Sequence, residues 1–182
     1  MIVLIVGLFL WCSGHYFKRA LPDLRARLGA RGSGVSALLI LGGLVLMIVG
    51  YRTSNTGVAY FPPDWGIHAN NFLMVIAVIL VGMGSSKGKM RSWFRHPMLM
   101  AASVWSVAHL LISGDWVSVV LFGGIGLWSV SEMFLINVKV GPWERPEPGP
   151  VSGDIKLLVI SGIVFAVITG IHVLLGLWPF PG

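Results

Sequence analysis

The chain has 182 residues, of which 55% are hydrophobic and only 11% charged, with a formal net charge of +6 and a mean hydropathy of +0.84. A soluble domain carries about a quarter charged residues, so the composition excludes an ordinary soluble protein. The charges gather between apolar runs about as long as a membrane-spanning helix, and no run alternates with the two-residue period of a strand. We therefore expect an all-α integral membrane protein with a single domain over residues 1–182.

Six apolar runs predict a bundle of six transmembrane helices. In chain order they cover residues 1–17, 35–51, 67–84, 97–113, 116–136 and 155–178. The first and fourth runs are short, and snorkelling side chains of Lys18 and Arg95 would lengthen each of them effectively. Between the last two runs, four prolines among residues 141–150 predict an extended linker.

The basic residues indicate the orientation of these helices. All but one of the 13 Lys and Arg residues lie in the segments 18–34, 85–96 and 137–156, which are alternate connections. Such residues concentrate in cytoplasmic loops, so both termini are predicted to lie outside, in the periplasm of a bacterial inner membrane. Arg52 alone lies on the outer side. The positive net charge is then explained by a basic cytoplasmic face that contacts anionic lipid, and it does not indicate nucleic-acid binding.

Histidines inside the predicted helices carry most of the chemical information. His15, His109 and His172 lie in apolar runs, where an ionisable side chain is costly and indicates a functional site. At about 1.5 Å per helical residue, they lie about 5, 18 and 25 Å from the cytoplasmic edge, respectively. His96 lies at that edge, and His68 near the outer surface. The depths therefore predict an inner group with His15 and His96, and an outer group with His109 and His172, of which His68 is a further candidate member.

Two neutral imidazoles from separate helices are suited to hold haem iron from both sides. His109 shares its helical face with Ala101 and Trp105, and His172 shares its face with Gly176. Small residues leave room for a flat macrocycle, and aromatic residues pack against it. The alternative for each histidine is a hydrogen bond to a neighbouring helix.

Other polar residues near the apolar runs are explained by helix structure. Arg95-His96-Pro97 is typical of a helix start, with Pro97 in the first turn and His96 at the cap. Asp115 and Asp154 precede apolar runs and are predicted to cap helices. Glu132 lies one turn inside the fifth run and is predicted to pair with a basic residue at the cytoplasmic surface.

Several short motifs follow one another along the chain. They are Gly14-His15 followed by Leu21-Pro22 and Arg25-Ala26-Arg27-Leu28; Arg95-His96-Pro97-Met98-Leu99; Trp105 with Ala108-His109-Leu110-Leu111 and Gly114-Asp115; and Asp154 with His172. In these motifs the chain resembles the NnrU family of membrane proteins over nearly its whole length. The residues from Arg95 to Asp115 are the most specific part.

The resemblance implies a role in nitric-oxide and denitrification metabolism, with which bacterial members are associated. It also implies a b-type haem held by two histidines, as in the related 15-cis-zeta-carotene isomerase, which isomerises a carotenoid double bond. Residue by residue, it makes His15 and His109 the axial ligands. That relative has a cysteine three residues before the histidine matching His109, where this chain has Ser106, and Cys12 takes the equivalent place before His15.

The depths and the resemblance favour different ligand pairs. His15 and His109 differ by about 13 Å along the membrane normal, whereas His109 and His172 differ by about 7 Å. Helix tilt would reduce the larger difference. Two haems, one between His15 and His96 and one between His109 and His172, are a third arrangement. His109 is therefore the first candidate ligand, with His15 or His172 as its partner.

Three functions follow from these features. The first is redox-linked haem chemistry on nitric oxide, or cis–trans isomerisation of an apolar polyene such as zeta-carotene. The second is a non-catalytic accessory or regulatory role in nitric-oxide respiration, with a partner docking on residues 137–154 and the basic loops. The third is a small transporter with two inverted three-helix halves, although no predicted helix has a break near mid-membrane.

Overall fold

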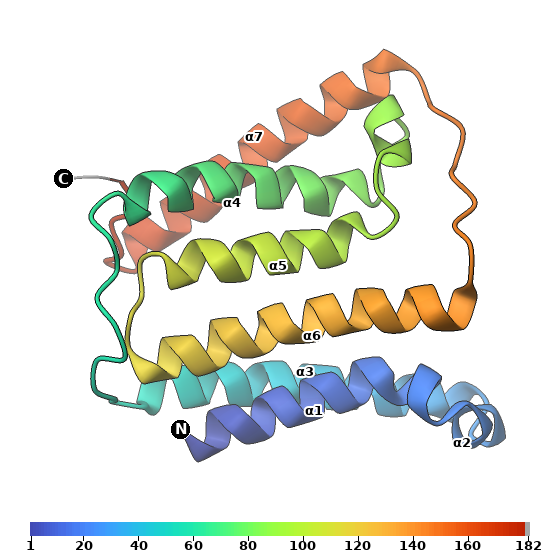
Figure 1. Ribbon diagram of the computed structural model, residues 1–182, viewed down its shortest axis with the longest axis horizontal. Helices are drawn as coiled ribbons and strands as arrows, with labels where there is room; N and C mark the ends of the chain where they lie inside the picture. Colours follow the sequence, from blue (N-terminus) through green and yellow to red (C-terminus); the bar gives the residue numbers. More distant parts are fainter. Residues whose placement is uncertain (181–182) are drawn as a thin grey trace.

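A computed structural model describes residues 1–180 of the chain. The helices are α1 (Ile2–Ala20), α2 (Pro22–Arg27), α3 (Ala30–Thr53), α4 (Gly66–Met83), the 3-10 helix η1 (Lys89–Ser92), α5 (Pro97–Leu110), α6 (Trp116–Val140) and α7 (Val151–Leu174) (Figure 1). Within residues 1–180, β pairing is confined to one isolated bridge between Val58 and Asp115. The all-α prediction is therefore confirmed.

The six long helices alternate in direction, so their connections gather at two ends of the molecule (Figure 1). One end holds α2, η1 and the linker 141–150, together with every Lys and Arg residue except Arg52. We call it the basic end. The opposite end holds the N-terminus, the last turn of α7, the loop 54–65 and the connection 111–115.

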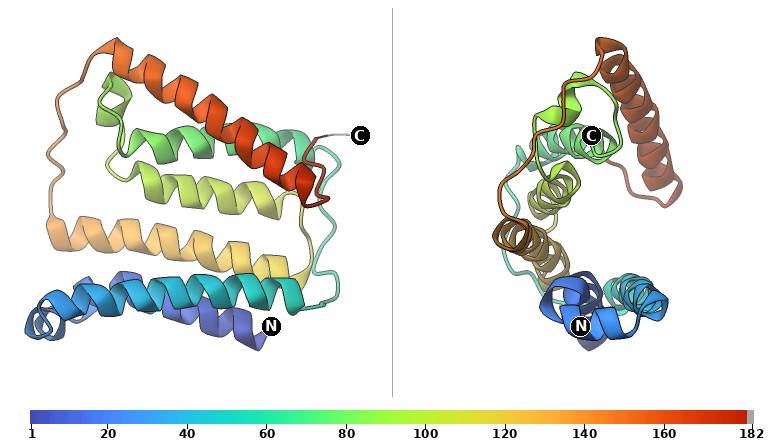
Figure 2. Two further views of the ribbon diagram at one scale, coloured as in Figure 1. Left: turned by 180° about the vertical axis from the view of Figure 1, so that it is seen from behind. Right: turned by 90° about the vertical axis from the view of Figure 1, so that its right-hand side faces the viewer.

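The long helices form a curved row in which each packs on its neighbours. The order is α3, α1, α6, α5, α4 and α7, and α3 also touches α6. Seen along the helices, the row is an open curve with α3 and α7 at its two tips (Figure 2). Because α3 and α7 pack on the row and not on each other, the curve has one open side.

Four helices are long and apolar enough to cross a bilayer: α3 from Arg31, α4, α6 and α7. In the apolar stretch of each of these helices, only 11% to 28% of the residues are buried inside the structure. Most of the apolar residues of these helices therefore face outward. Exposed apolar area of this extent is stable against acyl chains and not against water. The chain is a multi-pass helical membrane protein. All six predicted runs form helices, but α1 and α5 are not among these four, and α5 has only 14 residues.

Close backbone contacts hold α1 against α3. A Cβ atom on Gly7 would lie 2.6 Å from the backbone nitrogen of Met47, and one on Gly43 would lie 2.7 Å from the backbone nitrogen of Trp11. Side chains are absent at both glycines, so the two helix axes approach closely, as small residues permit in membranes. This hairpin places Trp11 and the last turns of α3 beside α6.

Helix capping follows the sequence at two positions and departs from it at a third. Asp115 caps α6 and accepts hydrogen bonds from the backbone nitrogen and hydroxyl of Ser118 at 2.9 and 2.7 Å. His96 precedes α5 as predicted. The prediction for Asp154 is wrong, because α7 begins at Val151, directly after Pro150. The Asp154 carboxylate instead accepts the backbone N–H groups of η1, at 2.9 Å from Met90.

Candidate functional site

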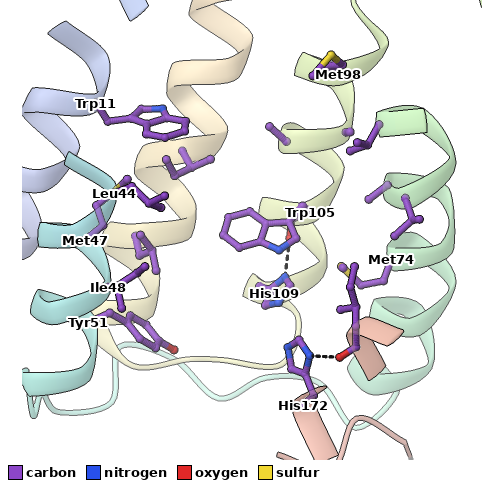
Figure 3. Close-up of a pocket in the computed structure, with 18 of the residues that line it drawn as sticks. Trp11, Leu44, Met47, Ile48, Tyr51, Met74, Met98, Trp105, His109 and His172 are labelled. Carbon is purple, nitrogen blue, oxygen red and sulfur yellow. Dashed lines mark hydrogen bonds between the residues drawn. The ribbon is translucent and has the colours of Figure 1, made fainter. Parts of the chain in front are cut away.

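A cavity of about 640 Å³ lies inside the curve of helices (Figure 3). All six long helices contribute to its lining, which is apolar apart from two indoles, Tyr51, Arg52, His109 and His172. It follows α5 from Met98 to His109, which is about 16 Å of helix. The two histidines lie together near the end of the cavity that is farther from Met98 (Figure 3).

A second cavity, of about 370 Å³, begins at the same histidines. It shares Tyr51, His109 and His172 with the larger cavity and continues to Asn70 and the segment 176–179 near the opposite end. The two imidazoles therefore stand at the junction of two spaces, each of a size typical of ligand pockets.

Contacts within α5 and α6 fix the His109 side chain. Its Nδ1 atom lies 2.9 Å from the carbonyl oxygen of Trp105, one turn earlier in α5. A carbonyl oxygen can only accept, so Nδ1 carries the hydrogen and donates it. In a neutral imidazole the lone pair is then on Nε2. The ring stacks on Phe122 of α6 and is tilted against Trp105, with both ring-centroid separations at 4.7 Å.

His172 repeats this arrangement on α7. Its Nδ1 atom lies 2.8 Å from the carbonyl oxygen of Ile168 and donates to it, which again leaves the lone pair on Nε2. Within residues 1–180, neither Nε2 atom takes part in a hydrogen bond with another protein group. Two imidazoles on different helices therefore line the same cavity, and the lone pair on the Nε2 atom of each is free to bind a metal.

The structure does not bring His15 to this place. The His15 ring packs between Trp11 and Trp128, with centroid separations of 4.6 and 4.5 Å, and lines neither cavity. Its Nε2 atom is buried without a hydrogen-bond partner in the described part of the chain. His96 is at the basic end, where its Nε2 atom lies 2.9 Å from the side-chain oxygen of Asn137. His68 is exposed in the first turn of α4.

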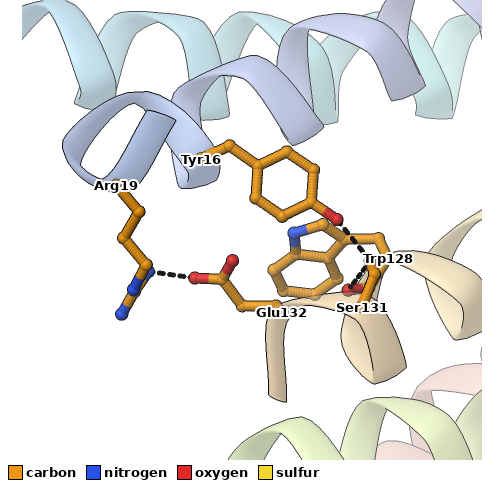
Figure 4. A network of polar contacts seen from close by, with 5 residues as sticks. All are labelled: Tyr16, Arg19, Trp128, Ser131 and Glu132. Carbon is orange, nitrogen blue, oxygen red and sulfur yellow. Dashed lines mark hydrogen bonds and ion pairs between the residues drawn. The ribbon is translucent and has the colours of Figure 1, made fainter. Parts of the chain in front are cut away.

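Glu132 has the ion pair that the sequence predicts. Its carboxylate is buried in α6 and pairs with Arg19 of α1 (Figure 4). One residue earlier, Ser131 bonds to the hydroxyl of Tyr16, also from α1. These contacts join α1 to α6 near the basic end. None of the four residues lines either cavity.

The sequence did not identify three residues that line one or both of the two cavities. Tyr51 and Arg52 lie in the last turn of α3 and line the larger cavity. Phe122 lines the second cavity and stacks on the ring of His109. A usable signal existed only for Arg52, which is the single basic residue away from the basic end. Phe122 lies inside an apolar run and Tyr51 is the last residue of one, and nothing in these runs distinguishes residues that line a cavity from residues that pack against a neighbouring helix.

The metal-binding side chains that line the cavity limit the metal ions or cofactors that it can hold. Across residues 1–180, no cluster of three or more His, Cys, Asp or Glu residues could hold a metal ion. Two imidazoles are too few to hold a bare ion but are sufficient for haem, because the porphyrin supplies the other four nitrogen ligands. The apolar lining and the neutral tautomers fit such a group.

The fold and this cavity define a multi-pass helical membrane protein with an internal cavity lined by two histidines. A model of the NnrU family, described as NnrU protein, matches residues 3–179, and the chain belongs to this family. The resemblance noted in the motifs is thereby confirmed. Neither the curated proteins nor the solved structures contain a match to the chain.

Proposed function

We propose that this protein binds b-type haem between His109 and His172 and uses it in redox-linked chemistry on a small or apolar molecule. The observation that carries the proposal is the pair of Nε2 lone pairs at one cavity, each fixed by an Nδ1–H bond to a carbonyl oxygen. Such bonds orient metal-binding imidazoles and raise their basicity.

His172 is a better partner for His109 than His15 is. His109 and His172 line the same two cavities, whereas Trp11 and Trp128 enclose the His15 ring. A haem shared by His15 and His109 would require one of these indoles to move. The ligand pair favoured by the depth estimate is therefore the one we propose.

Haem held in this way would supply a one-electron centre, and one of the two histidines would have to leave the iron before a diatomic molecule such as nitric oxide could bind. The chain's own residues hold and shield the group. His109 of α5 and His172 of α7 would hold the iron, while Trp105 and Phe122, which pack on the His109 ring, would keep water from it. In a bilayer, the open side between α3 and α7 would face lipid, so an apolar molecule such as a polyene could enter from the membrane without crossing water.

We also propose that all six long helices cross a bacterial inner membrane, with the basic end in the cytoplasm. α5 is short, but Arg95 precedes it and donates to the carbonyl oxygen of Gly141 at 2.7 Å, which keeps this charge at the basic end. A cysteine introduced at Gly57, in a Cys12→Ser background, should react with an impermeant reagent added to intact cells. One at Glu147 should not.

Absorption spectra of purified variants test the haem proposal. With haem supplied during expression, the wild type should show a reducible six-coordinate low-spin spectrum, which His109→Ala and His172→Ala should each lose. His15→Ala should keep it, as should the exposed control His68→Ala. A wild type without a Soret band, or an unchanged spectrum in His109→Ala, would contradict the proposal and favour a non-catalytic accessory role.

A further inference from the structure

Arg52 is the one cation at the cavity that contains the histidines. It lies in the last turn of α3, next to Tyr51, and lines the larger cavity. The residue is exposed, so it stands at the rim of the cavity. All other Lys and Arg residues are at the basic end.

No carboxylate of residues 1–180 pairs with Arg52. Two acidic residues lie at the same end of the molecule as Arg52. Asp64 is exposed, and the carboxylate of Asp115 accepts hydrogen bonds from Ser118. A guanidinium group beside an apolar space attracts an anionic group on whatever occupies that space, since Arg binds carboxylates through two parallel hydrogen bonds. The cavity is thus apolar along most of its length and cationic at one end.

We infer that Arg52 is the residue that binds the carboxylates of the cavity's ligand, which for b-type haem are its two propionates. This inference rests on the proposed function. Haem has one anionic edge and one apolar edge. The cavity is likewise cationic at the end with Arg52 and apolar at the end with Met98. Arg52 and the two histidines belong to the same end of the cavity, so the iron ligands and the carboxylate partner select one orientation of the group.

Two probes test this role in the full-length chain: haem, and haem dimethyl ester, in which both carboxylates are methylated. Each is titrated into protein expressed under haem limitation, and the Kd is measured from the Soret band. The wild type should bind haem about fivefold more tightly than the ester, which is the effect of an exposed ion pair. Arg52→Gln should lose this preference by weakening haem binding alone, and Arg52→Lys should retain most of it.

Arg27→Gln is the matched control, because Arg27 is exposed at the basic end. It should discriminate between the probes as the wild type does. Equal weakening of both probes in Arg52→Gln, or an unchanged preference, would overturn the role of Arg52 and leave the haem site in place. Failure of the wild type to bind either probe would remove the proposed function and this inference together.

Discussion

His109 and His172 owe their orientation to their own helices. Each Nδ1–H group bonds to the carbonyl oxygen four residues earlier, which can accept from the imidazole as well as from the helix backbone. The orientation of the two imidazoles therefore needs no polar partner from a neighbouring helix. This explains how a site with two imidazoles can stand in an almost wholly apolar cavity.

The Arg19–Glu132 pair should behave as a buried ion pair. Glu132 is 3% exposed, and the Arg19 side chain is 27% exposed. Arg19→Met leaves a buried carboxylate without its partner, so the free energy of unfolding should fall by about 3 kcal/mol. Thermal unfolding followed by circular dichroism in detergent measures this change. The double variant Arg19→Met with Glu132→Met should recover much of the loss, and equal instability of the single and double variants would contradict the account.

Asp115 gives a pH-dependent contribution outside the membrane-spanning segments. Burial alone would raise the pKa of Asp115, but hydrogen bonds from the Ser118 hydroxyl and backbone N–H groups outweigh it and lower the pKa below its usual value. A lowered folded-state pKa stabilises the protein above the unfolded value of about 3.9, and this stability is lost as pH falls through the folded pKa. At neutral pH, Asp115→Ala should therefore cost about 1 kcal/mol.

The test is the difference in unfolding temperature between the wild type and Asp115→Ala as a function of pH. The difference should be constant near neutrality and should narrow below about pH 4. A difference that stays the same in acid would show that the carboxylate charge contributes nothing to the cap.

At the scale of helices, two adjacent glycines in α3 allow a matched comparison. A Cβ atom on Gly43 would meet backbone atoms of α1, whereas one on Gly42 has nothing within 4 Å. Gly43→Ala should therefore push α1 and α3 apart and cost about 1–3 kcal/mol in the free energy of unfolding. Gly42→Ala should be neutral or stabilising, because Ala favours helix over Gly. Similar effects of both substitutions on thermal unfolding would contradict the close packing of this hairpin.

Helices were predictable from the sequence because apolar length and flanking charge are local properties. Caps were predictable only where their partners are local as well. Asp115 bonds to Ser118, three residues away, whereas Asp154 bonds to Met90, 64 residues away. A local rule assigns Asp154 to the helix that follows it and cannot detect the distant η1.

At the scale of the molecule, the depth estimate selected the histidines that the fold brings together. Counting residues along two helices was sufficient because α5 and α7 run in the same direction from the basic end. The cavity itself was not predictable. It depends on the curvature of the helix row and on the separation of α3 from α7, and no periodicity in either helix encodes these.

The electron paramagnetic resonance spectrum of the oxidised His172→Ala variant tests the central claim most directly. The wild type should give a low-spin signal with two imidazole ligands, and the variant should convert to high spin and return to low spin when imidazole is added. His15→Ala should keep the wild-type signal. A low-spin signal that survives in His172→Ala but disappears in His15→Ala would contradict the account.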